Sequence, residues 1–459
     1  MNTRIPSLSM TQRRIHIISR FDVALLVFMI AVRIALIVYL YPDKNKFLDG
    51  DSAYYEGLAV HFLQHGIYLH PSGGKFSDLL RPPGYPAFIM LNYALFGTEA
   101  FLALVLWNIV GVGLTYWGIK KLLLRLDASP QPLTLIFFAL DLAWILYSKD
   151  LVTEPLFTPL LIVSVLQVFD FLENKTLKPC IIAALLMGIT ALIKPITLYL
   201  PLVIMPIMYL FTRNYRAGIV FALVFIATIS PWLIRNKLTH NTFSFTSIQN
   251  QNLLYAHGAF VYADLYKTTH LQAQSMITRE LYHFYPDFDQ LSYADMNRAT
   301  GKLARKILAE HPFLYAKAIV RGMAITLFDP GRMVFNQTFP SEDPQQIGFT
   351  DTIGKIGLWG TFKLLLQKNP LTVVVLVSYL LLLSLANAFA FAGIYAFWKH
   401  QPMYFVCISA LVLYLLLLGG PNGYARFRLY IFPFWLLYAN YGISACKAWL
   451  QSKLSLFKP

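Results

Sequence analysis

The chain has 459 residues, of which 57% are hydrophobic and 13% are charged. Soluble domains average about 45–50% apolar and about 25% charged residues, so this composition excludes an ordinary water-soluble protein. The net charge of +15 does not indicate nucleic-acid binding, because the lysines and arginines lie in small groups between long apolar segments. We therefore expect an all-α, polytopic membrane protein with no nucleic-acid partner.

Ten apolar segments are predicted to cross the membrane as helices, because about 17 to 25 apolar residues span a bilayer of about 30 Å. They cover residues 21–40, 98–119, 131–148, 155–172, 179–194, 195–212, 217–235, 371–398, 402–419 and 430–446. Alternate crossing places the loops richest in lysine and arginine on one side, which the positive-inside rule identifies as the cytoplasm. We expect a multi-pass protein of the plasma (inner) membrane with both termini in the cytoplasm.

Two connecting segments on the predicted outer side are long, residues 41–97 and 236–370. We therefore expect three parts. An N-terminal transmembrane module covers residues 1–235 and includes the outer loop 41–97, a second outer loop covers 236–370, and C-terminal transmembrane helices cover 371–459.

The second outer loop contains two segments with helical periodicity and basic residues, 295–312 and 313–328. This pattern is typical of helices that lie on a membrane surface. The alternative for the second segment is a further span at 313–329, which would change the parity of the topology.

Ionisable side chains gather near the predicted outer ends of the helices, where charged groups are costly and usually functional. They are Asp49, Asp51, Arg81, Asp150, Glu154, Lys194, Arg235, Arg426 and Arg428. Arginine can give phosphate oxygens two parallel hydrogen bonds and lysine adds a point charge, so the basic members indicate a site for an anion. The alternative for any single arginine is that its side chain extends to the lipid headgroups.

Arg81 begins the sequence "RPPGYP". The two prolines restrict the backbone and the glycine permits a tight turn, so this segment is predicted to present the guanidinium group rigidly. The alternative is that the prolines only start the next helix.

Asp49 and Asp51 form an Asp-x-Asp pair of the kind that holds a metal in nucleotide-sugar enzymes. Nucleotide sugars are cytoplasmic, whereas the charge pattern places this pair outside, so a nucleotide-sugar donor is excluded. A sugar linked to a polyprenyl phosphate is an activated donor that is present on the outer side.

Seven short motifs occur along the chain in this order: "GDSAYYEGLA", "RPPGYPAFI", "LVTEPLF", "GITALIKP", "SPWLIRN" with "NTFSF", "AEHPFLY" and "ARFRLYIFP". In these the sequence resembles the GT-C superfamily of polyprenyl-phosphate-sugar glycosyltransferases, particularly bacterial members similar to protein O-mannosyltransferases and the lipid A aminoarabinose transferase. The resemblance implies a bundle of about ten transmembrane helices with outward juxtamembrane helices and a large outer loop.

The resemblance also implies roles for individual residues. The family's outer-loop acid and the tyrosine four positions later match Asp51 and Tyr55, its basic residue before two prolines matches Arg81, and its acid before a proline matches Glu154. One departure is Ser52, which stands where many relatives have a second acid.

The reaction implied by the resemblance begins when the hydroxyl or amine of an acceptor approaches Asp51, which acts as general base or orients the nucleophile. Attack on the anomeric carbon opposite the phosphate inverts its configuration. The leaving polyprenyl phosphate needs charge stabilisation, which Arg81 is expected to provide with other basic residues. The other basic residues expected to contact the phosphate are Lys194, Arg235, Arg426 and Arg428.

Glu154 is expected to bind the acceptor or to hold a basic partner. The alternative is a structural ion pair with Lys149 or Lys194.

Tyr54, Tyr55 and Tyr85 are candidates for the sugar pocket, although aromatic residues also anchor proteins at membrane interfaces. The expected partners are a polyprenyl-phosphate-sugar donor, a glycan, lipid or protein acceptor, and membrane lipids. Asp49 and Asp51 could hold a divalent cation, but no metal or other cofactor is expected.

Two alternatives to this glycosyltransferase remain. A glycan polymerase or ligase that uses a lipid-linked oligosaccharide would need the same anion site. A polyprenyl-lipid transporter would be expected to have charges near the middle of the membrane and two pseudo-symmetric halves, whereas the charges here lie at the outer ends of the helices.

Overall fold

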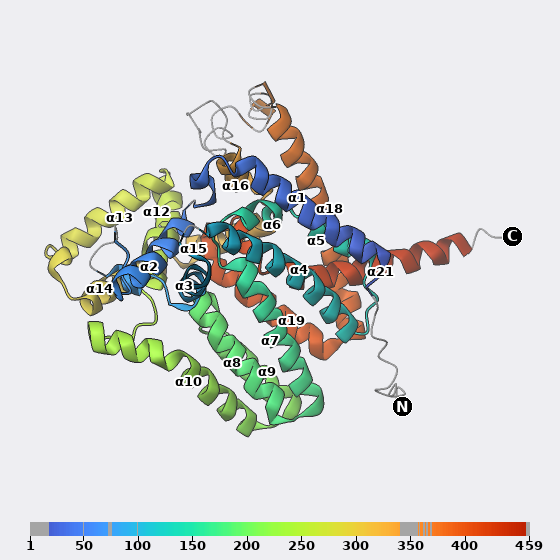
Figure 1. Ribbon diagram of the computed structural model, residues 1–459, viewed down its shortest axis with the longest axis horizontal. Helices are drawn as coiled ribbons and strands as arrows, with labels where there is room; N and C mark the ends of the chain where they lie inside the picture. Colours follow the sequence, from blue (N-terminus) through green and yellow to red (C-terminus); the bar gives the residue numbers. More distant parts are fainter. Residues whose placement is uncertain are drawn as a thin grey trace.

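The structure, a computed structural model, describes residues 18–48, 50–71, 76–98, 100–339 and 370–455, together with residues 357, 359, 360, 363, 366 and 367. Regular secondary structure in this described part is entirely helical. Figure 1 shows a bundle of long helices with a smaller group of helices at one end. The predicted fold class, an all-α polytopic membrane protein, is confirmed by these helices and their apolar composition.

Seven of the described helical segments are long and apolar enough to cross a membrane. They are α1 (Arg20–Leu40), α4 (Phe101–Arg125), α7 (Glu154–Asn174), the segment Pro195–Thr212 with η5 (Pro195–Thr197) and α9 (Pro201–Thr212), α10 (Tyr215–His240), α18 (Pro370–His400) and α19 (Pro402–Gly419). An eighth crossing results if α5 (Pro132–Ala139) and α6 (Leu142–Leu146), which meet at a bend of 47°, form one broken span.

The other two predicted spans are also helical, as α8 (Leu177–Ile193) and α21 (Phe432–Ser455). By length and composition the described chain therefore has seven or eight candidate spans rather than ten. α8 has only 17 residues. α21 carries polar residues such as Asn440, and it is buried continuously from Phe432 to Ile443 because other helices enclose it. The Asn440 amide group bonds to the backbone of Gln131 and Ser129.

α18 and α21 approach each other closely through two glycines. A Cβ atom at Gly393 would lie 1.9 Å from the carbonyl oxygen of Tyr438, and one at Gly442 would lie 1.9 Å from the carbonyl oxygen of Phe389. Small residues at helix contacts in membrane proteins allow such close backbone packing. The contact fixes the first half of α21, from Phe432 to Ile443, inside the bundle, whereas Figure 1 shows the end of this helix projecting beyond it.

The segment from residue 248 to residue 310 forms the smaller group of helices. It contains α11 (Ile248–Asn252), the π-helix η6 (Leu253–Gly258), α12 (Ala259–Tyr266), α13 (His270–Phe284), η7 (Phe288–Gln290) and α14 (Tyr293–Glu310). α15 (Pro312–Phe328) and α16 (Arg332–Thr338) follow, and Val334 and Phe335 of α16 are buried in the core of the bundle. We call residues 248–310 the outer unit. They enclose a second apolar core, separate from that of the bundle, around Ile277, Leu303 and Ile307.

α14 turns its apolar face into this second core. Leu303 and Ile307 are buried there, whereas Lys302 and Arg305 are exposed on the opposite face. The expectation that residues 295–312 lie with their apolar face on a membrane is therefore wrong, because protein already covers that face.

α15 has 17 residues and is not among the candidate spans, so the alternative of a crossing at 313–329 is not supported. Its basic residues Lys317 and Arg321 both pair with Asp264 of α12, at 3.3 Å each. These pairs tie α15 to the outer unit.

The loop that precedes α4 folds beside the outer unit. It contains η2 (Lys44–Phe47), α2 (Asp51–His65), η3 (Ser77–Leu79) and α3 (Gly84–Phe96), and Figure 1 shows α2 and α3 at the same end of the bundle as α12 to α14. The backbone amide of Ser247 donates to the carbonyl oxygen of Leu79, and the rings of Phe76 and Tyr293 lie 5.2 Å apart. We call this the outer end of the bundle.

We expect Gly442→Val to lower the thermal unfolding temperature, because the added side chain must push α21 away from Phe389. Overpacking of this kind costs roughly 1–3 kcal/mol. Unfolding in one detergent, followed by tryptophan fluorescence, would measure the effect. The matched control is Gly113→Val in α4, where a Cβ atom meets nothing within 4 Å; equal losses in both variants would contradict the prediction.

Candidate active site

Five of the ionisable residues singled out from the sequence form one hydrogen-bonded group at the outer end, which we call the outer charge cluster. Its members are Asp51, Arg81, Glu154, Lys194 and Arg426. They come from the first turn of α2, the turn before α3, the start of α7, the residue after α8, and α20 (Ala425–Arg428). Asp51 and Arg426 are 375 positions apart in the chain, so only the tertiary fold can bring them together.

Asp51 lies between two guanidinium groups. Its Oδ1 accepts a hydrogen bond from Arg81 Nη2 at 2.6 Å, and its Oδ2 accepts one from Arg426 Nη1 at 2.7 Å. Both carboxylate oxygens are therefore engaged, each by a different arginine.

Glu154 holds the inner part of the cluster. Its Oε1 accepts from Lys194 Nζ at 2.8 Å and from Arg426 Nε at 2.7 Å. The hydroxyl of Thr153 donates to Glu154 Oε2 at 3.1 Å and also lies 3.3 Å from Lys194 Nζ. Of the two lysines considered for an ion pair, Glu154 thus pairs with Lys194, whereas Lys149 pairs with Asp150.

The cluster has three basic and two acidic members, which leaves an excess of one positive charge. Burial differs between its two carboxylates, because the Glu154 side chain is 0% exposed whereas that of Asp51 is 32% exposed. Arg81 is intermediate at 17%. The cluster is therefore closed at Glu154 and open at Asp51.

Arg81 keeps one donor without a partner among the described residues, because its Nε is buried and makes no hydrogen bond to any of them. The backbone around it is fixed: Tyr68 donates to the Arg81 carbonyl oxygen at 3.1 Å, and Thr246 donates to that of Leu80 at 2.7 Å. At the start of α3, Gly84 lies directly against the backbone of Leu192 in α8. The segment "RPPGYP" is thus held on both sides.

Aromatic rings pack against the cations of the cluster. The Cζ atom of Arg81 lies 5.4 Å from the ring centre of Tyr55, and Lys194 Nζ lies 5.0 Å from that of Tyr430. Tyr55 and Tyr85 are in edge-to-face contact at 5.0 Å and are 4% and 1% exposed. They form a buried wall behind Arg81 rather than an open pocket surface.

Tyr54 lies on another side of α2. Its hydroxyl donates to the carbonyl oxygen of Ser77, and its ring stacks on His70 at 4.3 Å. It braces the loop that leads to Arg81 and makes none of the cluster's hydrogen bonds.

The charges around Asp51 determine its ionisation. Burial raises the pKa of its carboxyl group, but the positive charges of Arg81 and Arg426 lower it by more, so the pKa lies below the usual value for aspartate. Asp51 is therefore a carboxylate at neutral pH and, in this arrangement, a weak base.

Arg235 was expected to hold the donor phosphate, but it lies outside the cluster. Its Nη2 pairs with Asp78 Oδ2 at 2.5 Å, and His240 Nε2 lies 2.7 Å from the same oxygen. Asp78 belongs to η3, just before Arg81 in the chain. Arg235 and His240 of α10 therefore anchor the loop that carries Arg81.

Arg428 is also outside the cluster, and the structure gives it an internal role instead of the expected contact with phosphate. The side chain is 1% exposed and lies 3.4 Å from Asp141 Oδ2. It donates to the carbonyl oxygen of Asp329 at 2.7 Å and to the hydroxyl of Tyr379 at 3.0 Å. These bonds anchor α20 and so position Arg426.

Sequence reasoning missed three residues that support the cluster: Thr153, Asp141 and Asp329. Asp329 Oδ2 accepts from the backbone amide of Ala425 at 2.7 Å, at the start of α20. A signal existed for Asp141, because it is a carboxylate inside the apolar segment 131–148. Thr153 and Asp329 stand in sequence contexts that carry no such signal.

Asp49, the remaining candidate, lies outside the described residues. Within the described part of the chain, no group of three or more histidine, cysteine, aspartate or glutamate side chains is placed to hold a metal ion.

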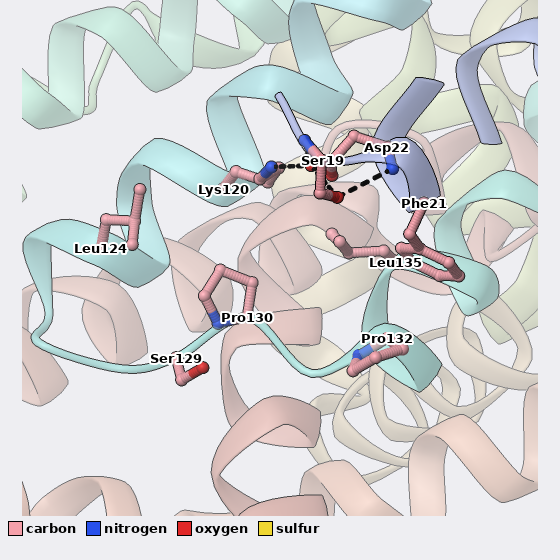
Figure 2. A pocket seen from close by; sticks show the side chains of 9 residues that line it. All are labelled: Ser19, Phe21, Asp22, Lys120, Leu124, Ser129, Pro130, Pro132 and Leu135. Atoms are coloured by element: carbon pink, nitrogen blue, oxygen red, sulfur yellow. Dashed lines mark hydrogen bonds and ion pairs between the residues drawn. The ribbon is translucent and has the colours of Figure 1, made fainter. Parts of the chain in front are cut away.

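Figure 2 shows a pocket at the opposite end of the bundle, between the start of α1 and the loop before α5. Its ionisable residues satisfy one another, because Lys120 Nζ pairs with Asp22 Oδ2 at 2.6 Å and Tyr116 donates to Asp22 Oδ1 at 2.7 Å. The charges of the described residues that line this pocket cancel, so these residues do not match the predicted anion site.

We expect the effect of Asp51→Asn on stability to depend on pH. The ionised carboxylate stabilises the fold through Arg81 and Arg426, and because its pKa is lowered, this contribution is complete at neutral pH and is lost as the pH falls below about 4. The variant should therefore unfold at a lower temperature than wild type at pH 7, with a shrinking difference in acid. Thermal unfolding across pH tests this, with the exposed Asp43→Asn as control; a difference independent of pH would contradict it.

Comparison with known proteins gives limited similarity. No family model and no curated protein matches the chain. Two crystal structures are similar, both of ArnT, a lipid A aminoarabinose transferase, from Cupriavidus metallidurans. The apo form is 16% identical over 82% of this chain and 80% of that chain, with a TM-score of 0.37. The form bound to undecaprenyl phosphate is 13% identical over 92% of this chain and 77% of that chain, with a TM-score of 0.38.

Proposed function

We propose that the protein is an integral membrane glycosyltransferase of the GT-C type. It transfers a sugar, with inversion, from a polyprenyl-phosphate-linked donor to a glycan, lipid or protein of the cell envelope, on the extracytoplasmic side of the plasma membrane.

The outer charge cluster is the observation that carries this proposal. Arg81, Lys194 and Arg426 surround only two carboxylates, so an additional anion would neutralise the excess charge. Within the part of the chain that the structure describes, Arg81 Nε is a buried donor with no partner, and guanidinium groups suit phosphate oxygens in particular.

An apolar groove at the end of α3 that is remote from Arg81 is consistent with a long lipid chain on the donor. The groove lies between the end of α3 and the first half of α4, and its lining residues are Phe96, Ala103, Leu106, Trp107 and Val110. A row of aromatic contacts connects it with the wall behind Arg81: Tyr85 to Phe88 at 6.1 Å, then Phe88 to Trp107 at 6.3 Å. A donor with its phosphate at Arg81 would have its prenyl chain run along α3 past the partly exposed Phe88 and Trp107 to this groove.

The proposed reaction assigns one task to each member of the cluster. The acceptor's oxygen or nitrogen forms a bond to the anomeric carbon while the bond from that carbon to the phosphate oxygen breaks, and the acceptor's proton passes to Asp51. Arg81 and Arg426 stabilise the charge that develops on the leaving phosphate. Glu154, fully buried, holds Arg426 and Lys194 in place.

We expect Arg81→Gln to lower the transfer rate by about 10²- to 10³-fold, as is typical when one donor to a developing oxyanion is removed. Arg81→Lys should retain part of the rate, because it keeps the charge but loses the fork of donors. The assay gives purified protein a panel of radiolabelled polyprenyl-phosphate sugars with cell-envelope acceptors. Lys237→Gln, an exposed basic residue at the end of α10, is the control; an unchanged rate in Arg81→Gln would refute the phosphate role.

The proposed extracytoplasmic location of the outer charge cluster can be tested separately. In a variant without the native cysteines, Ala53→Cys places a thiol on an exposed position two residues after Asp51. We expect a membrane-impermeant maleimide to label it in intact cells once any outer membrane has been made permeable. Labelling only after the plasma membrane is opened would place the cluster in the cytoplasm and contradict the proposal.

A further inference from the structure

The position of Asp51 between Arg81 and Arg426 raises a question about its chemistry. A general base must accept a proton, yet both oxygens of this carboxylate already accept charge-assisted hydrogen bonds. These are the strongest hydrogen bonds in proteins and they disfavour protonation. Asp51 must therefore leave at least one arginine before it can act.

The donor's phosphate has the chemistry to take its place. A polyprenyl-phosphate sugar is a phosphodiester, with one negative charge shared by two equivalent non-bridging oxygens. A carboxylate also carries one charge on two equivalent oxygens. When the phosphodiester replaces the Asp51 carboxylate between Arg81 and Arg426, the charge and the number of acceptor oxygens stay the same. Arg81 Nε, which has no partner among the described residues, offers the phosphate an additional donor.

Of the two carboxylates in the cluster, only Asp51 can make this exchange. Glu154 is 0% exposed and is held by Lys194, Arg426 and Thr153. Asp51 is 32% exposed and stands at the first position of α2, after Gly50, whose φ of +56° is readily available to glycine. The Asp51 side chain can rotate toward the open side of the cluster.

We propose that Asp51 occupies the donor's phosphate site in the ligand-free chain, and that the phosphodiester displaces it from Arg81 and Arg426, freeing the carboxylate to take the acceptor's proton. This inference rests on the proposed function. Once Asp51 has left the two guanidinium groups, it has lost the two charges that lower its pKa most, so donor binding makes it a better base. Donor binding therefore precedes activation of the acceptor.

The exchange predicts that removal of the catalytic carboxylate strengthens ligand binding. Asp51→Asn abolishes the competing charge. Undecaprenyl phosphate, the phosphomonoester that the proposed reaction releases at the same two guanidinium groups, should therefore bind about tenfold more tightly than to wild type, the scale of one hydrogen bond to a charged group. A residue with a merely structural role would weaken binding when replaced. Affinity is measured by titration in phosphatidylcholine nanodiscs, and each variant's unfolding temperature shows whether it is folded.

Asp264→Asn is the matched control. Asp264 also bridges two basic side chains, Lys317 and Arg321, but it lies in the outer unit, so its replacement should leave the affinity unchanged. Binding to the Arg81→Gln variant distinguishes a failure of this inference from a failure of the proposed function. If Arg81→Gln weakens binding while Asp51→Asn fails to strengthen it, the exchange is wrong and the phosphate site stands. If Arg81→Gln binds as wild type does, the phosphate site itself is wrong.

A second measurement uses the wild-type chain and does not depend on a folded variant. Undecaprenyl phosphate should increase the modification of Asp51 by a water-soluble carbodiimide and an amine, relative to modification of Asp264 in the same sample. Mass spectrometry of the two peptides gives this ratio. An unchanged or lower ratio in the presence of the lipid would show that Asp51 keeps its partners, and would overturn the exchange.

Discussion

The double engagement of Arg426 is the interaction on which the outer end of the molecule depends. One guanidinium group bonds to Glu154 through Nε and to Asp51 through Nη1. An unpaired Glu154 at this depth would be strongly destabilising, so α20 must hold Arg426 in one place. The neighbouring bonds of Asp329 and Arg428 supply that constraint.

This arrangement divides the cluster into a permanent and a variable part. The pairs of Glu154 with Lys194 and Arg426 are enclosed and have no exposed carboxylate surface. The pairs of Asp51 are partly open and depend on a single turn of α2. A site of this kind combines a fixed electrostatic frame with one group that can change partners, which suits a reaction in which an anion must enter and leave.

Composition and charge pattern were enough to predict the helical fold and to single out five residues that the structure brings together in the cluster, because long apolar runs and charges beside them follow directly from the membrane environment. They could not separate Arg426 from Arg428, which are two positions apart. The difference depends on Asp141 and Tyr379, contacts set by the tertiary fold. The burial of the apolar face of α14 was missed for the same reason, since an amphipathic pattern does not say whether lipid or protein covers it.

The enclosed position of the first half of α21 has a consequence for biosynthesis. Asp51, Arg81, Glu154 and Lys194 all precede Arg426 by more than two hundred residues, and the ribosome delivers helices to the membrane in chain order. Until α20 and α21 have been inserted, Glu154 has Lys194 but lacks its second cation, and the site of α21 among the other helices is unfilled. Assembly of the outer charge cluster is therefore a late event in the maturation of the chain, and it can be completed only after the last helices have been inserted.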